Sequence, residues 1–136
     1  MIRFWPVVLA LLPSALGACN WQRDADEQKS AAQVARAIEV LRNAPNEMKA
    51  EPLKALGAVA CVGADVCATR NACRRGYQLH VDALQLIAVA KDRMAVRENR
   101  NAGQLLASAQ ESLTKAESSV MDCLEQERLL RHRYKF

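Results

Sequence analysis

The sequence contains few of the residues that build sheets and tight turns. Aromatic residues make up 4% of the 136 positions, and the whole chain contains only 5 glycines and 4 prolines. No long alternating run of β-branched residues occurs. Alanine, leucine, glutamate, glutamine, arginine and lysine, which favour helices, are abundant instead. We therefore expect an all-α fold, and the length predicts a single domain.

Sequence motifs of catalysis are missing as well. There is no G-x-S-x-G, no H-E-x-x-H and no glycine-rich phosphate loop. A net charge of +4 is mild, whereas nucleic-acid binding usually needs a concentrated basic face. We expect a protein that is not an enzyme and does not bind nucleic acid.

The N-terminus has the layout of an export signal. Arg3 is followed by an apolar stretch of 13 residues, 4–16, which is shorter than the roughly 20 residues that span a bilayer. Leu16-Gly17-Ala18-Cys19 resembles the lipobox of bacterial lipoproteins: an aliphatic residue, two small residues and a cysteine. The alternative is a buried N-terminal helix.

The resemblance implies a covalently attached lipid and a location in the cell. Residues 1–18 would be a cleaved signal peptide, and the thiol of Cys19 would carry diacylglycerol, often with a further palmitate-type acyl chain on the new amine. Asn20 follows the cysteine in place of aspartate, which implies delivery to the outer membrane, facing the periplasm or the cell surface. Two or three acyl chains anchor a protein firmly. Residues 19–30 are then expected to form a tether and residues 31–136 the folded domain.

The rest of the chain predicts three long helices and one short one, packed as a small antiparallel bundle. The first is expected over 24–43, because residues at a spacing of three to four form an apolar stripe and Pro45 follows. A short helix with Pro52 in its first turn is expected to run to about residue 62. The last two are expected over 69–97 and 104–130, joined by a turn at 98–102.

Two stripes of predicted buried residues align the last two helices. The first comprises Cys73, Tyr77, His80, Leu84, Ile87, Lys91 and Met94. The second comprises Leu106, Ala109, Leu113, Ala116, Val120, Cys123, Glu127 and Leu130. Laid antiparallel, a single register pairs the stripes along their length and places Cys73 opposite Cys123. Glu127 interrupts the second stripe and is expected at the solvent-exposed end of the bundle.

The four cysteines after Cys19 are expected to form two disulfides. An exported chain meets an oxidising compartment, and four cysteines allow three pairings. The helix register selects Cys73–Cys123, which leaves Cys61–Cys67. The alternative joins Cys67 to Cys73 and Cys61 to Cys123. The spacing of the cysteines is not that of a zinc site, so no metal is expected.

Two further features suggest contacts with other molecules. Arginines converge on one end of the predicted bundle and form a candidate partner-binding surface: Arg74, Arg75, Arg128, Arg131 and Arg133. Contact with an anionic envelope surface or an envelope protein is the function expected for it. His80, on a predicted buried stripe, is interpreted as a core histidine bonded to a neighbour.

Two other functions stay open. The first is a haem or copper carrier that uses His80 with Met48, Met94 or Met121, although no C-x-x-C-H is present for covalent haem attachment. The second is a lipoprotein of the inhibitor or immunity type. The favoured interpretation needs no cofactor other than the lipid on Cys19.

Overall fold

A computed structural model describes residues 16–136, with side chains from residue 21 onward, and no strand occurs in this range. The elements are α1 (Leu16–Asn43), the 3-10 turn η1 (Asn46–Met48), α2 (Ala50–Ala58), α3 (Ala64–Ala95) and α4 (Asn99–Tyr134). The predicted bundle of three long helices and one short helix is confirmed.

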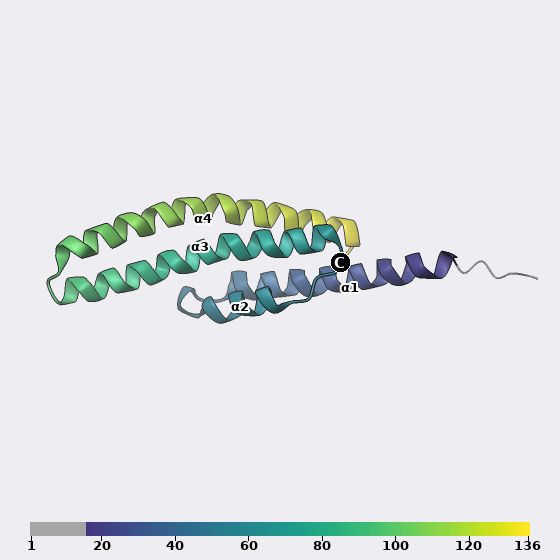
Figure 1. Ribbon diagram of the computed structural model, residues 1–136, viewed down its shortest axis with the longest axis horizontal. Coiled ribbons are helices and arrows are strands. Elements are labelled where there is room, and N and C mark those ends of the chain that lie inside the picture. Colours follow the sequence, from purple (N-terminus) through teal and green to yellow (C-terminus); the bar gives the residue numbers. More distant parts are fainter. Residues whose placement is uncertain (1–15) are drawn as a thin grey trace, which may run out of the picture.

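The helices α3 and α4 form one long antiparallel hairpin (Figure 1). The pair α1 and α2 covers only the part of this hairpin nearest the C-terminus, so the turn end of the hairpin projects beyond them (Figure 1). At the other end, the N-terminal part of α1 projects past the bundle in the opposite direction (Figure 1). The molecule is therefore elongated, with the start of α1 and the hairpin turn at its two extremes.

Several helix boundaries differ from the predicted ones. The helix α4 runs from Asn99 to Tyr134 rather than over 104–130, so most of the predicted turn at 98–102 is helical. The first helix begins at Leu16 rather than near residue 24, so the segment expected as a tether, 19–30, is helical. The short helix ends at Ala58 rather than near residue 62. The helix α3 begins at Ala64 rather than Thr69, because Gly63 takes a φ of 94° that suits glycine and redirects the chain just before it.

The end of α1 is closed by a lysine. The Nζ atom of Lys49 donates hydrogen bonds to the carbonyl oxygens of Leu41 (3.0 Å), Arg42 (3.0 Å) and Ala44 (2.8 Å). These carbonyls lie in the last turn and just beyond it, where no further helical N–H is available. Burial lowers the pKa of the Lys49 amine. The bonds fix the direction in which η1 leaves α1.

Small residues at heptad spacing form the contact between α3 and α4. On α3 they are Gly76, Ala83 and Ala90, and on α4 they are Ala102, Ala109 and Ala116, all of them buried. The Cα atoms of Cys73 and Cys123 lie 4.6 Å apart, so the two backbones approach closely. Such an approach is possible only where the facing side chains are small.

We call these two rows of small residues the alanine seam. The seam has the predicted register, but the stripe predicted to be buried on α3 is partly wrong. Cys73 lies opposite Cys123, as expected. The stripe on α3 was expected to stay buried as far as Lys91 and Met94, but both of these side chains are exposed, and Leu84 and Ile87 are only half-buried. The larger apolar side chains flank the seam because there is no room for them between the helices.

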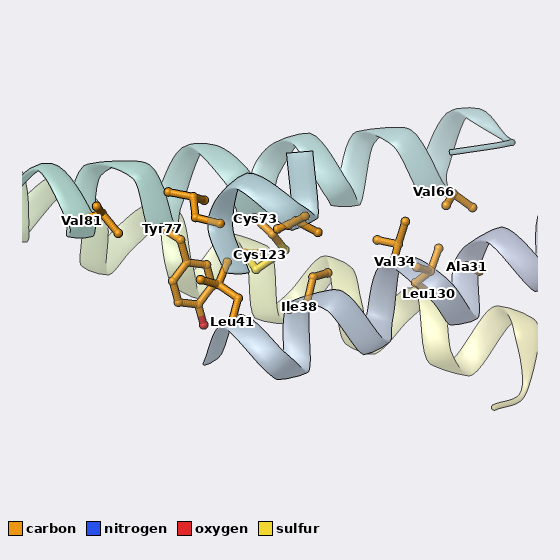
Figure 2. Packing of buried hydrophobic residues seen from close by; sticks show 12 residues of the cluster. Ala31, Val34, Ile38, Leu41, Val66, Cys73, Tyr77, Val81, Cys123 and Leu130 are labelled. Atoms are coloured by element: carbon orange, nitrogen blue, oxygen red, sulfur yellow. A yellow bond between two sulfur atoms is a disulfide. The ribbon is translucent and has the colours of Figure 1, made fainter. Parts of the chain in front are cut away.

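The main core lies where all the helices meet (Figure 2). The helix α1 contributes its predicted stripe of Ala31, Val34, Ile38 and Leu41. These side chains pack against α3 and α4 around the Cys73–Cys123 disulfide (Figure 2). The core therefore belongs to one half of the hairpin, and the other half has only the alanine seam.

Both predicted disulfides are present. Cys73–Cys123 ties α3 to α4, and Cys61–Cys67 ties the connection after α2 to the first turns of α3. The hydroxyl of Ser30 holds the same connection from the α1 side, since it donates to the Ala60 carbonyl oxygen (3.3 Å) and accepts from the Val62 N–H (2.9 Å).

Candidate functional site

The predicted lipidation site lies at the start of α1. The backbone of residues 16–19 forms the first turn of that helix. The Cys19 side chain and the preceding residues of the predicted signal lie outside the part of the chain whose side chains the structure describes. Trp21, shortly after it, is 80% exposed.

The three arginines of the predicted basic surface that lie on α4 all form ion pairs. Arg128 binds both carboxylate oxygens of Glu125, at 2.8 and 2.6 Å. Arg133 donates to Asp65 at 2.7 Å. Arg131 contacts Glu127 at 2.8 Å and stacks over the Phe136 ring. Their charge is therefore largely matched within the protein.

The two arginines on α3 differ from these. No ion pair within residues 21–136 involves Arg74 or Arg75, and both side chains are exposed. They line a shallow surface depression together with Gln78 and Leu79. Arg74 also lies across α2, with its Cδ 3.3 Å from the position that a Cβ on Gly57 would occupy. The unmatched positive charge of the predicted surface is thus on α3.

His80 lies in a pocket at the point where α1 and η1 end against the hairpin. Its Nε2 forms a hydrogen bond of 3.3 Å with Oδ1 of Asn46, and Tyr77, Lys49 and Leu113 line the same pocket. Burial, with a further effect of the nearby Lys49 charge, lowers the pKa of His80, so that the neutral imidazole is favoured. The three methionines considered as ligands all have exposed side chains: Met48, Met94 and Met121. Within residues 21–136, no three His, Cys, Asp or Glu side chains are grouped as metal ligands would be.

Glu127 is a buried carboxylate, which corrects the prediction that it is solvent-exposed. It is 3% exposed and accepts hydrogen bonds from Arg42 (3.1 Å) and Arg131 (2.9 Å). The position was expected near an open end of the bundle, but α1 packs over it. Its place on a heptad stripe, four residues before Arg131, is the sequence pattern from which burial with a partner could have been predicted.

Tyr134 fixes the position of the C-terminus through its hydroxyl group. Its hydroxyl lies 3.1 Å from Glu27 and 3.3 Å from Asp65. Burial and then the hydrogen bond to Glu27, with the charges of both carboxylates, raise the pKa of Tyr134 to about 12. This contact joins the middle of α1 to the first turn of α3 and the last turn of α4.

Comparisons with family models, curated proteins and solved structures found no match for this chain. Among the described residues, no helix combines the length and the apolarity that crossing a membrane requires.

Proposed function

We propose that the chain is a lipid-anchored, non-enzymatic binding or scaffold module of the bacterial cell envelope, carried on the outer membrane. One observation carries the proposal: Arg3, the apolar stretch 4–16 and Leu16-Gly17-Ala18-Cys19 follow one another in the order that export and lipidation require. The two disulfides are consistent with an oxidising compartment outside the cytoplasm.

The geometry of α1 supports an anchor at this position. Because residues 19–43 all lie in α1, a lipid on Cys19 would be joined to the bundle through helix rather than through a flexible linker. This end of α1 projects away from the other helices, which leaves room for a membrane surface (Figure 1). Trp21 is exposed there, and tryptophan favours the level of the lipid headgroups.

The test of lipidation uses the full chain in a bacterial host supplied with an alkyne-bearing fatty acid. The wild type is expected to incorporate the label and to lose residues 1–18. Cys19→Ser should lose the label and keep these residues, as intact mass would show. The double variant Cys61→Ser with Cys67→Ser is the matched control and should stay labelled. Label that persists in Cys19→Ser, or a wild type that is never labelled, would contradict the proposal.

The contact surface of this module is proposed to include Arg74 and Arg75, since their charge is not matched within the described residues. Micelles of a short-chain phosphatidylglycerol titrated into the detergent-solubilised chain should give a measurable heat of binding. Arg74→Ser with Arg75→Ser should reduce that heat strongly, whereas Arg128→Ser should change it little, because Glu125 already neutralises Arg128. Equal loss in both variants would argue against this surface.

A further inference from the structure

The projecting half of the α3–α4 hairpin, residues 84–113, leaves an apolar face uncovered. Tyr77 on α3 and Glu127 on α4 are buried under α1. On α3, Leu84 lies one heptad after Tyr77 and therefore on the same face of the helix. On α4, Leu113 and Leu106 lie two and three heptads before Glu127 and continue the face of that residue. They lie beyond the end of α1, where Leu84 and Leu113 are half-buried and Leu106 is 38% exposed. We call this face the notch.

The notch is bounded by a step at one end and by the hairpin turn at the other. The step is the η1 turn, which packs beside His80 and carries Met48, 66% exposed. The turn carries Val96, 67% exposed. From His80 to Ala95 the helix α3 rises about 22 Å, at about 1.5 Å per residue. Measured from the step to the turn, the notch is therefore about 22 Å long.

The charges at the two ends are opposite in sign. The exposed residues Glu47 and Glu117 lie at the step, and the exposed residues Arg97 and Arg100 lie at the turn. Within residues 21–136, none of the four takes part in an ion pair. The two ends of the notch are thus complementary to each other, although a single chain cannot bring them together.

We propose that a second copy of this chain occupies the notch, related to the first by a two-fold axis, with the two hairpins antiparallel. Each turn then meets the acidic step of the other copy, and the apolar faces around Leu84, Ile87, Leu106 and Leu113 form a four-helix section. A parallel arrangement is blocked because α1 and α2 of each copy occupy the space that the other copy needs. Such a self-complementary contact closes on itself as a dimer.

The dimer also accounts for the weak packing of the projecting half. An alanine seam buries little apolar area, and helices of this kind gain most of their stability from tertiary packing. The second copy covers the flanking leucines that α1 covers elsewhere. If Cys19 carries lipid, a point that rests on the proposed function, the two anchors lie at opposite ends of the dimer.

Charge exchange tests the contact in the full chain, purified in detergent, by sedimentation velocity. The wild type should be a dimer. Arg97→Glu with Arg100→Glu, and separately Glu47→Lys with Glu117→Lys, should each raise the dissociation constant about tenfold or more. Mixing the two variants should restore a dimer, because each altered end then meets an oppositely charged end. Lys29→Glu with Arg36→Glu changes the net charge equally, on the exposed face of α1 away from the notch, and should remain dimeric.

Crosslinking locates the contact. Lys91 and Glu117 are both exposed, and in one chain they are separated along the hairpin by about 18 Å, from the register and the helix rise. Zero-length carbodiimide coupling in a mixture of ¹⁴N and ¹⁵N chains should give a Lys91–Glu117 peptide that contains both isotopes. A monomeric wild type, a dimer that neither charge variant weakens, a mixture that stays monomeric, or dissociation of the control would overturn the proposal. None of these outcomes depends on lipidation of Cys19.

Discussion

Gly76 of α3 packs directly on the backbone of Ser119 in α4. A Cβ atom on Gly76 would lie 2.9 Å from the carbonyl carbon of Ser119 and 3.0 Å from its oxygen. Backbone atoms cannot move aside as a flexible side chain can. The position thus sets how closely the two helices approach beside the Cys73–Cys123 disulfide.

Gly76→Ala should therefore destabilise the protein even though alanine favours helix. Overpacking of this kind costs about 1–3 kcal/mol, which exceeds the gain in helix propensity. Gly103→Ala is the matched control, because a Cβ there meets nothing within 4 Å. It should raise the free energy of unfolding by about 0.5–1 kcal/mol. Urea denaturation of both variants measures the difference, and equal effects would contradict the close packing.

Removal of the Glu127 carboxylate should cost more than removal of an exposed one. Glu127 is buried between Arg42 and Arg131, so Glu127→Ala is expected to lose about 1–3 kcal/mol of unfolding free energy. The two arginines keep access to water, which limits the loss. Glu125→Ala, which breaks the exposed pair with Arg128, should cost clearly less, because water screens that pair. Similar losses in both variants would mean that burial of Glu127 contributes nothing.

The two disulfides should contribute unequally to stability. Cys73–Cys123 closes a loop with a sequence separation of 50, and Cys61–Cys67 one of 6. The loss of chain entropy in the unfolded state predicts about 4 kcal/mol for the longer loop and about 2 kcal/mol for the shorter one. Replacement of each pair by alanines, followed by denaturation, tests this order. A larger loss for Cys61 and Cys67 would contradict it.

Both tyrosines should ionise at unusually high pH. Burial raises the pKa of Tyr77, and the pKa of Tyr134 is raised to about 12. In the Tyr77→Phe variant, absorbance at 295 nm should titrate near pH 12 in the folded protein and near pH 10 after denaturation. Because the unfolded state releases its proton first, the contribution of Tyr134 is complete below pH 10 and is lost as the pH rises toward 12. A midpoint near 10 in the folded variant would show that the contacts with Glu27 and Asp65 are absent.

Local patterns were enough to predict the helices and their order. The α1 stripe, the stop before Pro45 and the antiparallel register of α3 and α4 all follow from short-range spacing. Both disulfide pairings followed from that register and elimination. The helix boundaries were predicted less well than the helices themselves. The start of α3, for example, depends on the positive φ of Gly63, and composition does not reveal a backbone angle.

The sequence by itself determined an all-helical chain, two disulfides and a lipobox-like segment, because each depends on neighbours along the chain or on one repeating helical period. Only the tertiary structure decided which faces are covered. It placed α1 over Glu127 and left the equivalent face around Leu106 open, although both positions belong to one heptad pattern. The physical reason is that burial depends on where a third helix ends. Lys49 fixes that end through hydrogen bonds to carbonyl oxygens in the last turn of α1 and just beyond it.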